Sequence, residues 1–93
     1  MLYVAAYDVS DDKVRLEMSH ILLRFGERIQ ESVYECRLSR QQLAQLTAEC
    51  VPVLEKDESA NLRVYPVCQT CQRRAIALGA VTHARLEQPA IVI

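Results

Sequence analysis

The chain has 93 residues, of which 51% are apolar and 25% charged, and its formal net charge is −1. This composition is ordinary for one globular domain with a modest core; it excludes a disordered chain and any strong global attraction to nucleic acid. No apolar segment approaches the roughly 20 residues that cross a bilayer, and the first residues lack the pattern of a secretion signal. We therefore expect a single cytoplasmic domain over residues 1–93.

The chain opens on an apolar run of strand length, Leu2–Val9, rich in aromatic and β-branched residues. A run without polar alternation predicts a strand covered on both faces. Asp8 stands where this strand ends, and so at the rim of a sheet. From the residues alone, Asp8 is either a cap of the following helix or part of a site at this rim.

Ser10-Asp11-Asp12 predicts a helix start, with Ser10 as the cap and the two acids in the first turn, where the helix dipole favours negative charge. Val14, Met18 and the apolar residues after them follow at helical spacing. Gly26 is expected to end this helix, as glycine often does.

Residues 28–38 predict a second strand, and a slip in their apolar parity indicates a β-bulge or bend near 30–32. Ser39 and Gln42 have the spacing of a capping box, which begins a second helix. Pro52 should kink this helix or end it early.

The remainder of the chain predicts shorter elements. A polar turn at 57–61 precedes a third strand at 62–67, and residues 68–77 are expected to form one short helical turn. A fourth strand is expected at 80–86. The terminal apolar segment at about 89–93 should pair with a sheet edge, either in its own chain or in a partner's.

The order of elements predicts an α+β fold, the ferredoxin-like βαββαβ sandwich with a short C-terminal strand added. Both helices of this fold cover one face of an antiparallel sheet. Since the opening strand is apolar on both faces, the simplest cover for the second face is another copy of the chain, which predicts a homodimer through the sheet faces.

Two residue types bear on chemistry. Nine of the eleven basic residues are Arg, which indicates either a phosphate-binding surface or a general preference for Arg over Lys. The four cysteines should be reduced in the cytosol, and Cys68-x-x-Cys71 lacks the second close pair typical of structural zinc. The sequence leaves the role of Cys68 and Cys71 open.

Three segments together resemble the CRISPR-associated protein 2 family. They are Tyr7-Asp8-Val9-Ser10-Asp11-Asp12-Lys13-Val14-Arg15, then Gly26 followed by Arg28-Ile29-Gln30-Glu31-Ser32-Val33-Tyr34-Glu35-Cys36, and finally Val64-Tyr65-Pro66-Val67-Cys68-Gln69-Thr70-Cys71. The resemblance covers nearly the whole chain. It implies a ferredoxin-like homodimer that acts in the adaptation stage of CRISPR immunity, in spacer acquisition, and holds duplex DNA beside the CRISPR-associated integrase.

The resemblance also implies a metal-dependent endonuclease on RNA or DNA, with Asp8 as both the catalytic and the metal-binding residue. The residues that match nucleic-acid-binding or supporting positions of the family are Tyr7, Arg15, Arg28, Ser32 and Tyr34. Glu17 departs from the pattern, because some members carry a second Arg there.

A single carboxylate is a poor site for Mg²⁺ or Mn²⁺, but two Asp8 side chains across a two-fold axis would suffice, with water and substrate phosphates as the other ligands. Two alternatives to a metal nuclease stand: a purely architectural dimer that binds nucleic acid without catalysis, and an unrelated ferredoxin-like dimer that binds a small ligand or regulates a partner.

Overall fold

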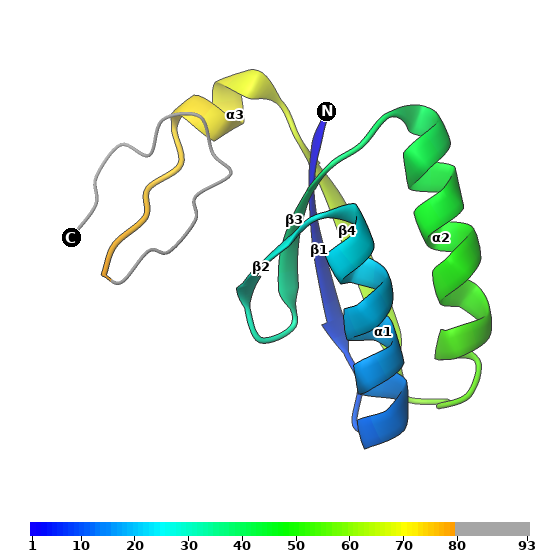
Figure 1. Cartoon of the computed structure of the whole chain (residues 1–93). Helices are drawn as coiled ribbons and strands as arrows, with labels where there is room; N and C mark the ends of the chain where they lie inside the picture. The colour runs from blue at the N-terminus through cyan, green and yellow to red at the C-terminus, as the bar shows by residue number, and fades with distance from the viewer. Residues whose placement is uncertain (80–93) are drawn as a thin grey trace.

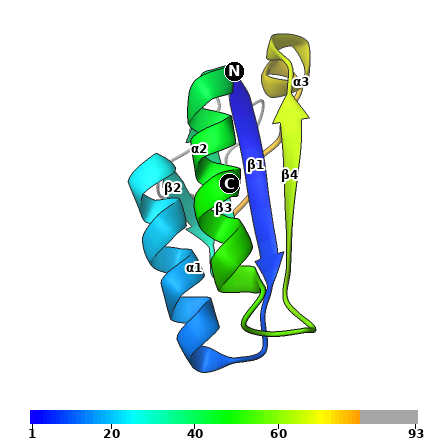
Figure 2. The same ribbon diagram turned by 90° about the vertical axis from the view of Figure 1, so that its right-hand side faces the viewer.

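The computed structural model describes residues 1–79. They form an antiparallel sheet of four strands in the order β2-β3-β1-β4, with two helices on one of its faces (Figures 1 and 2). The elements are β1 (Leu2–Asp8), α1 (Asp12–Phe25), β2 (Glu27–Gln30), β3 (Val33–Arg37), α2 (Arg40–Leu54), β4 (Asn61–Val67) and α3 (Gln69–Arg73). This is the ferredoxin-like α+β arrangement that the sequence predicts. Among these helices none is long and apolar enough to cross a membrane.

The core lies between the sheet and the two long helices. Its largest fully buried side chains that join the strands to the helices are Tyr34, Met18, Leu22 and Leu46. Alternation along β1 directs Ala5 and Tyr7 to this core. The apolar stripe of α1 therefore packs where the sequence pattern predicts.

The other face of β1 is also apolar, as predicted, but neither α1 nor α2 covers it (Figure 2). Val4 and Ala6 lie on this face and are half-buried. On the neighbouring strand β4, Tyr65 pairs with Val4 and is 50% exposed. Leu2, on the same face, is fully buried, so outside the helix side the cover of β1 is only partial.

The prediction of one strand over 28–38 is wrong, because this segment is a hairpin. β2 and β3 pair with each other and are joined by a turn at Glu31 and Ser32. The predicted bulge is confirmed, since the register shifts between Arg28 and Gln30. A parity slip arises from a chain reversal as well as from a bulge, and here both occur within five residues.

Because the hairpin contains two strands, the sheet has four strands by residue 67. The segment predicted at 62–67 as the third strand is therefore the fourth strand, β4. The strand predicted at 80–86 and the segment at 89–93 lie outside the described residues. The short helical turn expected within 68–77 is confirmed as α3.

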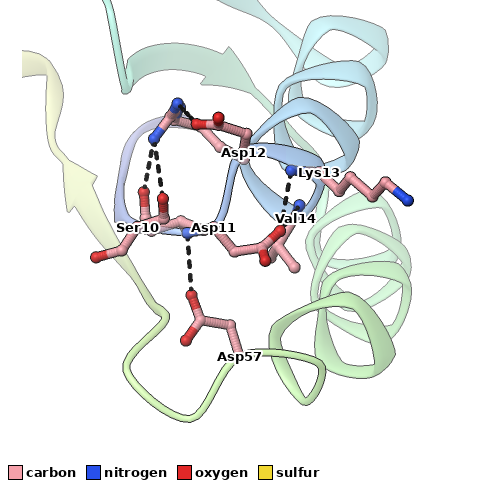
Figure 3. Close-up of polar contacts among 8 residues, drawn as sticks. Ser10, Asp11, Asp12, Lys13, Val14 and Asp57 are labelled. Atoms are coloured by element: carbon pink, nitrogen blue, oxygen red, sulfur yellow. Dashed lines mark hydrogen bonds and ion pairs between the residues drawn. The ribbon is translucent and has the colours of Figure 1, made fainter.

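The cap of α1 is Asp11 and not Ser10, so the helix begins one residue later than predicted. The Asp11 carboxylate accepts hydrogen bonds from the backbone N–H of Lys13, at 2.9 Å, and of Val14, at 3.0 Å (Figure 3). The backbone N–H of Asp11 itself donates to the Asp57 carboxylate at 3.3 Å. Because Asp11 caps the helix, Asp8 is not needed for that purpose.

The second helix begins as predicted. Ser39 and Gln42 form a reciprocal capping box, with distances of 3.1 Å and 2.8 Å. Pro52 lies inside α2, which continues to Leu54, so the helix does not end at the proline. Proline removes only one backbone donor, and this close to the C-terminus the loss does not stop the helix.

Candidate active site

A cleft of about 740 Å³ opens at the end of β1, between the start of α1 and the β2–β3 turn. Its lining residues come from all three of these places: Tyr7, Asp8, Val9, Asp12, Arg15, Leu16, Ser19, Arg28, Glu31 and Ser32. Of the six site residues predicted from the sequence, only Tyr34 is missing from this lining, and it lies directly behind it in the core. The structure therefore brings the predicted residues together.

Asp8 is the last residue of β1, and its side chain is exposed at the cleft. Within residues 1–79 its carboxylate makes no hydrogen bond and no ion pair. The same part of the chain contains no group of three or more side chains that could hold a metal ion. One copy of the chain thus offers a solvated hard oxygen ligand, which suits a cation that takes most of its ligands from water and phosphate.

Arg15 is tied to the loop between β1 and α1. Its Nη1 donates to the carbonyl of Val9 at 3.2 Å and to that of Ser10 at 3.4 Å, while Nη2 pairs with Asp12. The side chain remains 48% exposed. Arg15 therefore fixes the loop that follows Asp8, and Asp12 partly neutralises its charge.

Arg28 projects from β2 toward the same cleft and is held from behind. Its Nη2 donates to Ser19 Oγ at 2.7 Å and to the Tyr34 hydroxyl at 3.0 Å, and its Nε donates to the same hydroxyl at 3.1 Å. No ion pair joins Arg28 to an acid within the described residues. Since Nη1 has no hydrogen-bond partner among them either, Arg28 presents an oriented cation with a donor available for a phosphate, although the charge of Glu31 also acts on it.

The two tyrosines connect the cleft to the core. The rings of Tyr7 and Tyr34 stack with centroids 6.0 Å apart. Burial raises the pKa of Tyr7 to about 12, and its hydrogen bond with Tyr34 adds to that effect. Burial alone would raise the pKa of Tyr34, but hydrogen bonds with Ser19, Arg28 and Tyr7 outweigh it and lower that pKa. The Tyr34 oxygen is therefore mainly an acceptor that orients Arg28.

Ser32 lies in the hairpin turn, beside the end of β1. Its carbonyl accepts the backbone N–H of Tyr7 at 3.1 Å. This bond holds the β2–β3 turn against β1, next to Asp8, and so forms one wall of the cleft.

Ser19 is a site residue that the sequence reasoning missed. It is buried on α1, accepts the hydrogen bond from Arg28, and accepts another from the Tyr34 hydroxyl at 3.0 Å. The available signal was its position, three residues before Leu22 and directly after Met18, on the border of the apolar stripe. A polar side chain buried there needs a partner, and Arg28 and Tyr34 are those partners.

The fold and the cleft define a class: a ferredoxin-like domain whose first strand delivers a solvated carboxylate to a rim that also carries arginines, an arrangement suited to phosphodiesters. The sequence profile of the family described as CRISPR associated protein Cas2 matches residues 1–75. The chain belongs to this family, as its resemblance predicts.

Individual relatives agree with this assignment. The CRISPR-associated endoribonuclease Cas2 of Thermus thermophilus is 38% identical over 89 residues, which are 96% of this chain and 94% of that one. Among solved structures, Streptococcus pyogenes Cas2 at pH 6.5 superposes with a TM-score of 0.72 at 25% identity, covering 85% of this chain and all of that one.

A chain of a partial Cas6-RT-Cas1–Cas2 complex gives a TM-score of 0.73 at 24% identity, covering 96% of this chain and 88% of that chain. At this level of identity the likeness shows the fold alone. The name of the Thermus thermophilus relative describes that protein as an endoribonuclease.

Proposed function

We propose that this protein is a homodimeric CRISPR adaptation protein that binds nucleic acid and hydrolyses phosphodiesters with a divalent cation, Mg²⁺ or Mn²⁺, at Asp8. One observation carries the proposal. The Asp8 carboxylate has no protein partner within residues 1–79 and lines the same cleft as Arg28, whose guanidinium is oriented and makes no ion pair within those residues. A carboxylate that neither caps a helix nor forms an ion pair is available to bind a cation, and the neighbouring Arg is available to bind a phosphate.

The dimer follows from strand alternation. Val4, Ala6 and Asp8 lie on one face of β1, and this is the face that neither long helix covers. Two copies packed through this face would bury the apolar residues and bring two Asp8 carboxylates to one interface. The second copy would then complete the site, because each chain ends β1 in one carboxylate, that of Asp8.

The residues of the cleft have separate roles in this proposal. A bound divalent cation would polarise the phosphate and lower the pKa of an attacking water. Asp8 holds the cation, and Arg28 binds a phosphate oxygen and stabilises the charge that develops on it. Ser19 and Tyr34 position Arg28, while Arg15 and the Ser32 carbonyl fix the two loops that frame the cleft.

The partners in this proposal follow from the family. They are duplex DNA, single-stranded RNA as a further substrate, and the CRISPR-associated integrase, all met in the cytoplasm. Support comes from the family match over residues 1–75 and from relatives named as endoribonucleases. An architectural dimer that binds duplex DNA without cutting it is the second candidate, and the lack of any group of three or more metal-binding side chains among residues 1–79 favours it.

The test compares the wild-type protein with Asp8→Asn on labelled single-stranded RNA and duplex DNA, in the presence of Mg²⁺, Mn²⁺ or a chelator. Asparagine keeps the shape of the side chain but loses the charge that a hard cation needs. Glu58→Gln is the matched control, because Glu58 is an exposed acid outside the cleft. Sedimentation checks that all three proteins remain dimers.

Cleavage by wild-type protein and by Glu58→Gln, lost with chelator and in Asp8→Asn, would establish the metal nuclease. If no protein cuts but all bind duplex DNA equally, the architectural function is correct. A wild-type protein that sediments as a monomer would remove the basis of both.

A further inference from the structure

Cys68 and Cys71 form a close pair of exposed thiols at the end of β4. Their Sγ atoms lie 3.4 Å apart, and the backbone N–H of Cys71 donates to Cys68 Sγ at 3.5 Å. Cys68 is the residue that caps α3, so the turn of this helix brings Cys71 back toward it. Both side chains are open to solvent.

We propose that Cys68 and Cys71 are a redox-active dithiol, which a small disulfide such as oxidised glutathione converts to an intramolecular disulfide. The sulfurs need to approach from 3.4 Å to a bond length of about 2.05 Å. Two adjacent side chains on one helical turn can make this approach by rotating, without any rearrangement of the sheet. A Cys-x-x-Cys spacing is also the one that thiol–disulfide chemistry commonly uses.

The two thiols are not equivalent, and this sets the order of reaction. The hydrogen bond from the backbone N–H of Cys71 lowers the pKa of Cys68, because it stabilises the thiolate. The pKa of Cys71 is raised, first by its hydrogen bond to Cys68 and then by the charge on that sulfur. Since the thiolate is the nucleophile, Cys68 reacts first.

The exchange proceeds in two balanced steps. The Cys68 thiolate attacks one sulfur of oxidised glutathione, forms a mixed disulfide and expels one glutathione thiolate, which takes up a proton. Cys71 then loses its proton, attacks Cys68 Sγ and expels the second glutathione. The protein loses two electrons and two protons, and the small disulfide gains them as two thiols.

A redox role fits this pair better than a structural metal site does. A structural zinc site needs four ligands, and residues 1–79 hold no group of three or more metal-binding side chains. Cys36 and Cys50 are buried in the core, where burial raises the pKa of each thiol to about 11. They are therefore neither ligands for the exposed pair nor competitors for the oxidant.

The dithiol lies at the opposite end of the sheet from the cleft. Val67, the last residue of β4, pairs with Leu2 at the start of β1, whereas Asp8 ends β1 beside Asn61. Six steps along a strand separate the two ends by about 20 Å. The proposal therefore stands apart from the proposed nuclease function.

The experiment equilibrates the full-length protein anaerobically with mixtures of oxidised and reduced glutathione, followed by acid quenching, thiol alkylation and tryptic peptide mass spectrometry. Cleavage after Arg63 and Arg73 places both cysteines in the single peptide 64–73, while Cys36 and Cys50 fall in separate peptides. This internal comparison needs no mutation. Cys68→Ser and Cys71→Ser are the matched pair of variants.

We expect peptide 64–73 to lose two hydrogen atoms in a fraction that follows the ratio of oxidised glutathione to the square of reduced glutathione. The other two cysteines should stay reduced. Cys71→Ser should accumulate the mixed disulfide at Cys68 faster than Cys68→Ser accumulates it at Cys71, because the backbone N–H that lowers the pKa of Cys68 remains in the first variant.

Three results would overturn the proposal. They are a peptide that stays reduced at every ratio, one that carries only separate glutathione adducts, and a reduced protein that retains one equivalent of zinc through gel filtration. Cleavage of nucleic acid should not change with the oxidation state, so a failure here leaves the proposed nuclease untouched, and the reverse also holds.

Discussion

The Arg28 guanidinium donates two hydrogen bonds to a single oxygen, the Tyr34 hydroxyl, from Nε at 3.1 Å and from Nη2 at 3.0 Å. Tyr34 is completely buried, whereas Arg28 is exposed at the cleft. The buried Tyr34 therefore fixes the position of the exposed Arg28 guanidinium. Its third member is Ser19, which accepts from both.

Ser19→Ala should loosen Arg28 without moving the backbone. Removal of the hydroxyl leaves the buried Tyr34 O–H without its acceptor, which costs about 1–3 kcal/mol of stability. We expect weaker nucleic-acid binding and slower cleavage, together with a lower melting temperature. Ser10→Ala is the control, because its hydroxyl makes no hydrogen bond within the described residues. Unchanged binding in Ser19→Ala would show that Arg28 needs no support from α1.

Arg28→Gln should change how binding depends on salt. An arginine that neutralises one phosphate contributes about 0.9 to the slope of log affinity against log salt concentration for duplex DNA. We expect the magnitude of that slope to fall by about this amount for each Arg28 that contacts DNA. Arg40→Gln provides a matched loss of charge on exposed α2, away from the cleft, and should matter less. Equal slopes in the two variants would remove Arg28 from the binding surface.

The two candidate caps of α1 can be separated by single substitutions. Asp11→Ala removes the acceptor of two backbone N–H groups and should lower the free energy of unfolding by about 1 kcal/mol. Ser10→Ala should leave it within about 0.5 kcal/mol of the wild type, as surface changes do. Chemical denaturation of both variants measures the difference. A larger loss in Ser10→Ala would restore Ser10 as the cap.

Gly26→Ala should be strongly destabilising because the added methyl group would collide with β3, and not because of the backbone conformation at residue 26. Its φ of −167° is extended, but an added Cβ would lie 2.2 Å from the carbonyl oxygen of Glu35 and 2.6 Å from Cys36 Sγ. Strand β3 would have to shift, at a cost of about 1–3 kcal/mol or more. Thermal unfolding checks this, and a melting temperature equal to that of the wild type would contradict it.

The buried thiols predict a loss of stability at alkaline pH. Burial raises the pKa of both Cys36 and Cys50 to about 11, above the ordinary value of 9.0 that the unfolded chain has. The folded state therefore holds these protons more tightly. Their contribution is complete below pH 9 and is lost as the pH rises to about 11, by about 2 kcal/mol for each thiol.

Urea denaturation between pH 8 and 11 measures this effect. Cys50→Ala lowers stability at every pH because it leaves a cavity, but it should also remove part of the pH dependence. The difference between the two proteins should therefore shrink as the pH rises. A constant difference would mean that Cys50 does not titrate in this range.

Much of the fold could be predicted from local patterns. The apolar run of β1, the stripe of α1 and the capping box of α2 each follow from spacing within a few residues, and the structure confirms them. The hairpin at 27–37 cannot be told from one strand by its sequence, because its turn of two residues contains neither glycine nor proline. Ser10 and Asp11 are both good caps by residue type, and only the backbone conformation decides that Asp11 is the cap.

The residues of the site also divide into those that the sequence predicts and one that it does not. The family resemblance brought Tyr7, Asp8, Arg15, Arg28 and Ser32 together, and the cleft contains all five. Ser19 could not be found in this way, since its role depends on β2 and β3 passing over α1, a contact between segments distant in the sequence. Local pattern thus predicts which elements form, while tertiary contact decides which polar residue serves the site.

The pairing of Leu2 with Val67 joins the start of β1 to the end of β4, two strands that are far apart in the sequence. β1 is an inner strand of the sheet, and among residues 1–79 β4 is the last strand to leave the ribosome. Until residues 61–67 have been synthesised, one edge of β1 has no partner, and Asp8 lacks its neighbour Asn61 on β4. Pairing across so long a loop is slow, so the nascent chain exposes an apolar edge for most of its synthesis, and any fragment that stops before β4 should aggregate instead of forming the cleft.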